Sequence, residues 1–232
     1  YLTQKNIVPG IKVDKGIIDL ASAPGDKITR GLDNLGERLS GYREQGARFT
    51  KWRAVLPITD RNPGRLSIQT NSEVLARYAA IAQHYGFVPI VEPEILIDGN
   101  HTIERCAEVS ECVWHELFHA LHRHHVALEY VILKPSMVIA GKACDTQASA
   151  EQVAETTFKI LKRTVPAAVP TINFLSGGQT PEQATRHLQL MNELAKAENN
   201  KPWNIGFSYA RALQGPAMAI WAGEESNAQE CR

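Results

Sequence analysis

Six short apolar runs recur along the chain at nearly regular intervals, and this spacing constrains the fold more than any other feature. Their residues are largely β-branched or aromatic, as in buried strands. The runs are Val8–Asp14, Thr50–Leu56, Phe87–Glu92, Tyr130–Lys134, Thr171–Ser176 and Trp203–Ser208. Measured between one polar residue of each run, the successive separations are 39, 41, 42, 42 and 32 residues. Each interval has room for one strand and one helix, so we predict a repeated strand–helix unit.

Helical patterns occupy the intervals between these runs. Ser72 is placed to begin one helix, and Gly86 is placed to end it. Ser149 and Thr180 each stand three residues before a glutamine, which is the pattern of a capping box. Alternating strands and helices indicate parallel strands joined by right-handed crossovers.

Six such units resemble a TIM (β/α)₈ barrel, an α/β fold of about 250 residues. The chain starts at Tyr1, immediately before a strand, and it has no initiator methionine. We therefore expect residues 1–232 to form a single partial barrel domain with about six of the eight units. The two missing strands would be the first two.

The charge balance argues against two broad classes of partner. The chain has 25 basic and 25 acidic residues, whereas proteins that bind nucleic acid or membrane surfaces normally have a basic excess. No apolar run approaches the roughly 18 residues that span a bilayer. Four cysteines without a C-x-x-C pair indicate free thiols: Cys106, Cys112, Cys144 and Cys231. We expect a cytoplasmic protein that binds neither nucleic acid nor membranes.

Charged residues stand near the carboxyl ends of the predicted strands, where a buried strand has no structural need for them. They are Lys12, Asp14, Lys51, Arg53, Glu92 and Lys134. In a barrel these ends converge on one face, which is where such enzymes carry out their chemistry. The alternative is a buried network of ion pairs without a catalytic role, which would cost desolvation energy. The pattern therefore favours an active site at this face.

Lys134 is the leading candidate for a nucleophile. It ends an apolar strand and precedes a proline, in a region that also holds Lys12 and Lys51. A neutral lysine amine attacks a ketone or aldehyde and forms a Schiff base. Glu92, one unit earlier, is suited to the proton transfers of imine formation. The alternative is that these lysines are surface groups outside the strands.

A pair of glycines after the fifth predicted strand marks a second candidate site. Ser176, Gly177 and Gly178 precede a helix whose free N–H groups can bind an anion, and glycines let the backbone approach a ligand closely. Ser208 and Arg211 follow the next strand and can complete a phosphate site. A simple turn is the alternative, but the position of the segment in the series favours phosphate binding.

The segment Trp114–His119 contains the H-E-x-x-H pattern of zinc proteases, with His125 as a candidate third ligand. The glycine that such sites need after the helix is absent. We therefore expect the helix to continue and to separate His115 from His125 by about 15 Å. Four apolar residues form a core stripe at helical spacing: Trp114, Leu117, Phe118 and Leu121. We predict an exposed, histidine-rich helix face without a bound metal.

Six motifs together resemble class I fructose-bisphosphate aldolase, in order and at family-like spacing through nearly the whole chain. They are Gly-Ile-Lys12-Val-Asp14-Lys-Gly, Lys51-Trp-Arg53, Ile-Val-Glu92-Pro-Glu94-Ile-Leu, Leu-Lys134-Pro-Ser-Met-Val, Phe-Leu-Ser176-Gly177-Gly178-Gln and Ser208-Tyr-Ala-Arg211-Ala-Leu-Gln. The resemblance implies a glycolytic lyase that cleaves fructose 1,6-bisphosphate reversibly to dihydroxyacetone phosphate and glyceraldehyde 3-phosphate. It implies no metal and no cofactor, because a protonated imine is the electron sink.

The resemblance also assigns roles to individual residues. Lys134 would be the Schiff-base lysine and Glu92 the main proton-transfer residue, with Lys51 supporting the imine chemistry and Glu94 close by. The phosphate nearest the ketone would be held by Ser176, Gly177, Gly178, Ser208 and Arg211. The other substrate-binding residues would be Lys12, Asp14 and Arg53, with Lys12 and Arg53 facing the far end of the sugar.

Three departures from the family pattern stand out. The first two strands are absent, and the first carries an aspartate used in carbon–carbon cleavage. The C-terminal tail is absent, and Ala210 replaces an expected glycine, where its methyl group would weaken phosphate binding. We therefore expect an internal fragment of a homotetrameric enzyme.

An open sheet exposes apolar edges, so we expect the isolated chain to be unstable or to aggregate. A compact monomer that melts cooperatively, in size-exclusion chromatography and circular dichroism, would contradict this expectation. The alternative function is that of a catalytically impaired fragment or a sugar-phosphate-binding scaffold protein, which the cleavage rate distinguishes from an enzyme.

Overall fold

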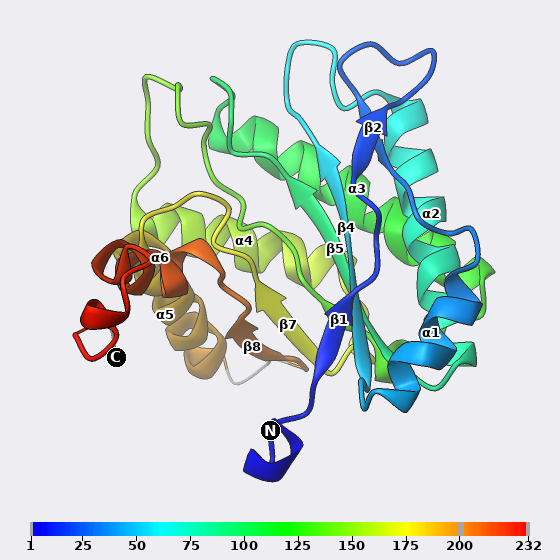
Figure 1. Ribbon diagram of the computed structural model, residues 1–232. Helices are drawn as coiled ribbons and strands as arrows, with labels where there is room; N and C mark the ends of the chain where they lie inside the picture. Colours follow the sequence, from blue (N-terminus) through cyan, green and yellow to red (C-terminus); the bar gives the residue numbers. More distant parts are fainter. Residues whose placement is uncertain (1, 199–201, 231–232) are drawn as a thin grey trace.

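The chain folds around a sheet of six parallel strands in the order β1-β4-β5-β6-β7-β8 (Figure 1). The structure is a computed structural model that describes residues 2–198 and 202–230. The strands are β1 Gly10–Lys12, β4 Phe49–Leu56, β5 Val88–Ile95, β6 Ile132–Leu133, β7 Thr171–Phe174 and β8 Asn204–Phe207. Each strand coincides with one of the predicted apolar runs, so the predicted α/β arrangement with six strand–helix units is confirmed.

One α-helix lies between each two successive strands of this sheet, and α6 follows the last strand, as the predicted alternation requires. They are α1 Leu35–Glu44, α2 Arg65–His84, α3 Ile103–Arg123, α4 Ala150–Thr164, α5 Pro181–Ala197 and α6 Arg211–Trp221. Short 3₁₀ helices cover Thr3–Lys5, Leu128–Tyr130 and Glu225–Asn227. Both predicted capping boxes are present: Ser149 opens α4 with Gln152, and Thr180 opens α5 with Gln183.

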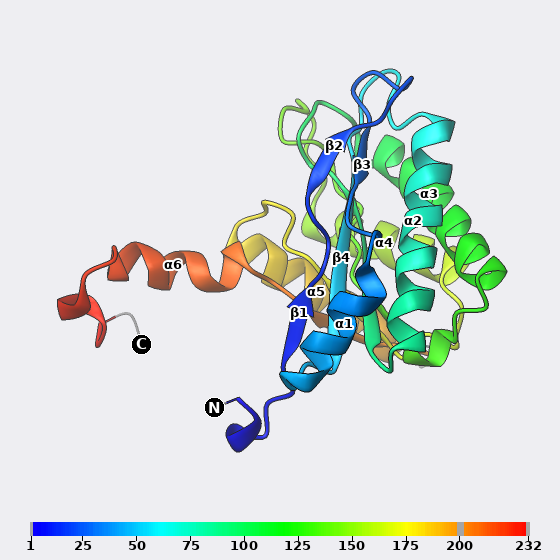
Figure 2. The ribbon, with the colours of Figure 1, turned by 45° about the vertical axis from the view of Figure 1, so that its right-hand side comes forward.

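The sheet is open, with β1 at one edge and β8 at the other. Helix α6 extends away from the body of the molecule (Figure 2) and buries none of its residues. Apolar side chains of α6 are consequently exposed, with Leu213 at 61% and Met218 at 59%. These exposed groups support the expectation that the isolated chain is unstable, which stays a prediction.

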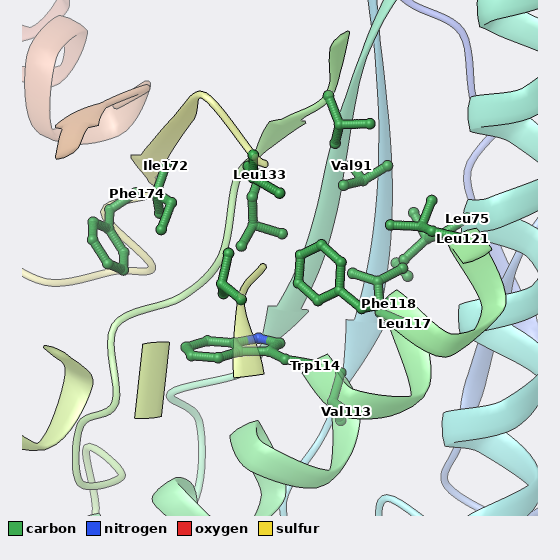
Figure 3. Packing of buried hydrophobic residues seen from close by; sticks show 14 of the residues in the cluster. Leu75, Val91, Val113, Trp114, Leu117, Phe118, Leu121, Leu133, Ile172 and Phe174 are labelled. Carbon is green, nitrogen blue, oxygen red and sulfur yellow. The ribbon is translucent and has the colours of Figure 1, made fainter. Parts of the chain in front are cut away.

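The apolar core lies between the sheet and the helices that cover one of its faces (Figure 3). On β4, Trp52 and Ala54 are fully buried, and the Trp52 ring stacks on Tyr78 of α2 with 5.3 Å between ring centroids. Lys51 and Arg53 alternate with them and are only partly buried. The strand therefore has one apolar face, and its other face carries the charged side chains of Lys51 and Arg53.

One local prediction is wrong, and one element was not predicted. Helix α2 begins at Arg65, after Gly64, and Ser72 is buried within it because that turn of the helix packs against the core. An antiparallel hairpin of β2 (Ile17–Asp19) and β3 (Lys27–Thr29) also precedes α1. Its short, mostly exposed strands lack the apolar pattern by which the parallel strands are identified.

Helix α3 confirms the predicted core stripe but corrects the expected course of the chain after it. The four apolar residues of the stripe are buried: Trp114, Leu117, Phe118 and Leu121. The helix ends at Arg123, and His125 has a left-handed φ of 52°, so the helix does not continue to His125 as expected. A left-handed residue ends a helix without requiring the expected glycine.

His115 and His119 are exposed and line a cavity of about 860 Å³ between α2 and α3. Within residues 2–198 and 202–230, no three His, Cys, Asp or Glu side chains are placed to hold a metal ion. The same residues include no helix long and apolar enough to cross a membrane.

Three of the cysteines have free thiols, as predicted: Cys106, Cys112 and Cys144. The fourth, Cys231, lies outside the described residues.

Candidate active site

Parallel pairing of β4 with β5 and of β5 with β6 places four charged groups side by side on one face of the sheet. Arg53 lies opposite Glu92 in the register, and Glu94 lies two residues further along β5. Lys134 follows β6 directly, and its backbone N–H donates to the carbonyl of Val91 at 2.8 Å. The hydrogen-bond ladder thus extends past β6 and fixes the position from which the Lys134 side chain departs.

The Glu92 carboxylate lies between two lysines. Its Oε2 is 3.0 Å from Lys51 Nζ, and its Oε1 is 3.2 Å from Lys134 Nζ. Glu92 is 4% exposed and Lys134 is 9% exposed, so both groups are largely removed from water. One carboxylate therefore forms ion pairs with both amines.

A second ion pair lies beside the first. The Arg53 Nε donates to Glu94 Oε2, and Glu94 is buried. This hydrogen bond raises the pKa of Arg53 above its ordinary value, against the opposing effect of burial. Arg53 therefore presents a fixed positive charge next to Glu92 and Lys134.

The ion pairs border a cavity of about 190 Å³. Lys134 and Glu92 line it together with groups suited to an anion. The full lining is Arg53, Glu92, Glu94, Lys134, Leu175, Ser176, Gly177, Ser208, Ala210 and Arg211. One amine, two carboxylates and two guanidinium groups thus face one small space.

The loop from Ser176 to Gly178 has a backbone that glycine favours. Gly177 and Gly178 have φ of 59° and 85°, which other residues rarely adopt. A Cβ atom on Gly178 would lie 2.9 Å from Lys142 Nζ, so a side chain there would also displace Lys142. Gly178 is absent from the lining of the cavity, and its importance is to let the loop turn toward α5.

Lys12, Asp14 and Lys51 also lie outside the cavity lining. Lys12 Nζ is 2.7 Å from Asp14 Oδ1, and the other oxygen of Asp14 accepts from the Arg53 N–H at 3.4 Å. Asp14 Oδ1 also accepts from the Gly16 N–H at 3.2 Å. These contacts hold the end of β1 against β4. Lys51 reaches the site through Glu92 alone.

Ala210 has φ of −107°, which is an ordinary value for an alanine. Its backbone therefore does not require the glycine that the family pattern led us to expect. The residue does line the cavity, so the predicted weakening of phosphate binding by its methyl group stays a prediction.

Two contributions to the site were not predicted from the sequence. Leu175 supplies an apolar wall of the cavity. The Ser136 hydroxyl donates to the Ile95 carbonyl and accepts from the Ile95 N–H, both at 2.9 Å, which binds the segment after Lys134 to β5. The only sequence signal for the Ser136 contacts was a serine inside an apolar segment.

Tyr209 binds the loop after β8 to α5, because its hydroxyl donates to the Ala184 carbonyl at 2.8 Å. Burial raises the pKa of Tyr209 from 10.0 to about 12. A phenol with a higher pKa in the folded state stabilises the fold below pH 10, and this stabilisation is lost as the pH rises through about 12.

We expect Tyr209→Phe to lower the free energy of unfolding by about 1 kcal/mol at pH 8, the usual value of one hydrogen bond. The difference from the wild-type chain should shrink at pH 11, where the unfolded phenol is ionised. Urea unfolding at the two pH values measures it. If the two chains differ equally in free energy of unfolding at pH 8 and pH 11, the ionisation of Tyr209 does not affect stability.

Comparison with known proteins adds independent information about this site. A family model described as class I fructose-bisphosphate aldolase, a glycolytic family, matches residues 1–232. A probable class 1 fructose-bisphosphate aldolase of Xanthomonas axonopodis pv. citri is 54% identical over 222 residues, which is 96% of this chain and 65% of the relative. The cytosolic fructose-bisphosphate aldolase 6 of Arabidopsis thaliana is 50% identical and covers 100% of this chain.

A solved structure is similar over the same region. Fructose-bisphosphate aldolase from Plasmodium falciparum, in complex with TRAP and a small molecule inhibitor, superposes with a TM-score of 0.95 at 45% identity. The match covers 99% of this chain and 66% of that one. This chain spans 65% of the Xanthomonas relative and 63% of the Arabidopsis relative. The chain belongs to the class I fructose-bisphosphate aldolase family.

Proposed function

We propose that the chain carries the Schiff-base site of a fructose-bisphosphate aldolase. The reaction is the reversible cleavage of fructose 1,6-bisphosphate to dihydroxyacetone phosphate and glyceraldehyde 3-phosphate. The observation that carries the proposal is that Lys134 Nζ, 3.2 Å from Glu92, lines one cavity with Ser176, Gly177 and Arg211. An amine paired with a proton-transfer group and an anion subsite are what a sugar-phosphate ketone requires.

Lys134 is the nucleophile in this proposal. Its neutral amine attacks the ketone carbon and forms a carbinolamine, which loses water to give an imine. Glu92 accepts the proton that the Lys134 amine gives up on attack and returns it to the hydroxyl of the carbinolamine, which leaves as water; the two groups lie 3.2 Å apart. The protonated imine then accepts the electron pair of the broken carbon–carbon bond, so no metal or cofactor is needed.

Lys51 and Glu94 do not react with the substrate in this proposal; each holds a neighbouring charged group in place. Lys51 balances the Glu92 charge from the opposite oxygen, 3.0 Å away, and so keeps the carboxylate in place when Lys134 reacts. Glu94 holds Arg53, which lines the same cavity. The base for the sugar hydroxyl in the cleavage step is not assigned to a residue of this chain.

The two ends of the substrate bind to different groups. Ser176, Gly177, Ser208 and Arg211 line the cavity and bind the phosphate nearest the ketone. Gly178 shapes that loop. Arg53 binds the other end of the sugar, with Lys12 and Asp14 at its margin.

The test is reduction of the isolated chain with borohydride in the presence of dihydroxyacetone phosphate, followed by peptide mass spectrometry. We expect one adduct of the ketone on Lys134. Omitting the ketone or the borohydride should give none. A chain that retains its helical circular dichroism and forms no adduct would overturn the Schiff-base assignment.

A second candidate function is a sugar-phosphate-binding protein without turnover. It rests on the lining of the cavity, in which Ser176, Ser208 and Arg211 would bind a sugar phosphate whether or not its ketone reacts. A cleavage rate separates the two: binding of dihydroxyacetone phosphate without cleavage of fructose 1,6-bisphosphate would support the second.

We further propose that residues 1–232 act as one partial barrel domain, that the protein is cytosolic and that the full-length protein is a homotetramer. The names of the Arabidopsis relatives support the cytosolic location, since they include the word cytosolic. The tetramer rests on the family resemblance alone.

A further inference from the structure

A buried histidine on α5 takes no part in the proposed chemistry, yet it contacts Gln179 in the loop of residues 176–179, which we call the phosphate loop. His187 Nδ1 is 2.6 Å from Gln179 Oε1. His187 is 5% exposed and Gln179 is 8% exposed, so the hydrogen bond is shielded from water. Burial lowers the pKa of His187 below its ordinary value, against the nearby carboxylate of Glu151, so the ring is neutral at neutral pH.

The contacts of the Gln179 amide nitrogen show which partner is the donor in the hydrogen bond between His187 and Gln179. Gln179 Nε2 donates to the Ser176 carbonyl at 3.0 Å and lies 3.5 Å from Met137 Sδ. The amide oxygen therefore faces His187 and needs a donor, because an unpaired buried acceptor is costly. His187 supplies it with a proton on Nδ1, which fixes the tautomer of the neutral ring.

The conformation of the phosphate loop depends on this amide. Within the loop, the Gln179 N–H donates to the Ser176 carbonyl at 3.0 Å, and the Gln179 side chain donates to the same oxygen. The two residues between them are glycines with left-handed φ, which have no side chains to restrict their motion. His187, by holding the amide, limits where Ser176 and Gly177 can lie at the edge of the cavity.

We propose that His187 is a positioning residue that acts through Gln179 to set the phosphate-binding loop. It determines affinity for the phosphate group of the substrate and leaves the reaction of the Lys134 amine unchanged. The proposal rests on the proposed function in assigning the anion at this loop to a sugar phosphate.

The geometry identifies a matched pair of substitutions. In asparagine the amide nitrogen is bonded to Cγ, as Nδ1 is in histidine, so His187→Asn can place a donor at the same point. His187→Leu fills similar space without a donor. Gln179→Met removes the amide from the other side and retains an unbranched side chain of similar length.

The experiment measures the ketone concentration that gives half-maximal borohydride-trapped adduct. It compares dihydroxyacetone phosphate with dihydroxyacetone, which has the ketone but no phosphate. For His187→Leu we expect the value for the phosphorylated ketone to rise about five- to tenfold, as for one lost hydrogen bond. The value for dihydroxyacetone and the maximal adduct yield should not change, and His187→Asn should restore most of the affinity.

Gln179→Met should give the same shift, and the double substitution with His187→Leu should be no weaker than either single one, because both remove the same contact. Equal losses for both ketones would overturn the proposal, since they would show an effect on Lys134 through Met137 or on the fold as a whole. An unchanged affinity in His187→Leu would overturn it as well.

Calorimetric titration with inorganic phosphate separates this proposal from the proposed function. If the wild-type chain binds phosphate, His187→Leu weakens binding and no chain forms an adduct, the positioning role stands and the Schiff-base function fails. If all variants form the Lys134 adduct at the same half-saturation, the function stands and the positioning role fails. A wild-type chain that binds neither phosphate nor dihydroxyacetone phosphate overturns both.

Discussion

Lys134→Arg should abolish the borohydride adduct with dihydroxyacetone phosphate, and any cleavage of fructose 1,6-bisphosphate should fall by at least about a thousandfold. Arginine keeps the positive charge beside Glu92, so the ion pair at this position can persist. A guanidinium, however, stays protonated in proteins and offers no free amine to a ketone. The substitution therefore removes the nucleophile while leaving the electrostatics of the site nearly intact.

Lys51→Arg is the matched control for this prediction. Lys51 contacts the same carboxylate at 3.0 Å but does not line the cavity. We expect this variant to keep the adduct on Lys134, with slower formation, because Glu92 is held less well. An adduct that persists in Lys134→Arg, or that maps to Lys51, would show that the nucleophile is assigned to the wrong lysine.

The sequence predicted the parallel strands well, and the reason is periodicity. Every buried strand must cross the core with apolar residues, and each strand–helix unit needs a similar length of chain. The hairpin of β2 and β3 has no such requirement, because its strands lie mostly at the surface and their residues need not be apolar.

Helix ends were harder to predict because they depend on surroundings that a local pattern does not contain. Thr180 and Ser149 cap α5 and α4 at exposed positions, where the local hydrogen bonds decide the start. Ser72 has the same type of side chain but is buried within α2. There the packing of the helix on the sheet overrides the local preference of serine for a cap.

Much of the proposed site followed from the sequence because strand ends must meet. Lys134, Glu92 and Ser176 belong to different units, and parallel pairing alone brings them to one edge of the sheet. Strand pairing could not predict which of these charged residues line the cavity and which lie outside it. Lys12 and Asp14 bind each other and lie outside the cavity lining, which the strand pattern does not reveal.

The contact of His187 with Gln179 could not be predicted from sequence at all. The two residues are eight apart, one on a loop and one inside α5, and no periodic pattern relates them. Their bond follows from how the loop folds back on its own helix. Hydrogen bonds of this kind are where a fold common to a family can differ in detail from one chain to another.

Trp114→Ala should lower the free energy of unfolding by about 3 to 5 kcal/mol, the largest effect that we expect on stability. Trp114 is fully buried, and its indole extends from α3 into the apolar core, which also holds Leu133 of β6 (Figure 3). Removing it leaves a cavity between α3 and the strand that precedes Lys134. Among the residues that the structure describes, the indole N–H has no hydrogen-bond partner, so removing it breaks no hydrogen bond and the loss should be about 3 kcal/mol.

His115→Ala, one residue further along α3, is the control because His115 is exposed. On the interpretation that Trp114–His119 has an apolar core stripe and a solvated histidine face, His115→Ala should change the free energy of unfolding by less than about 0.5 kcal/mol. Urea denaturation followed by circular dichroism measures both. A loss as large in His115→Ala as in Trp114→Ala would mean that the histidines hold the helix in place, as ligands of a metal would. A large loss in Trp114→Ala alone would establish that this segment stabilises the sheet from which Lys134 projects.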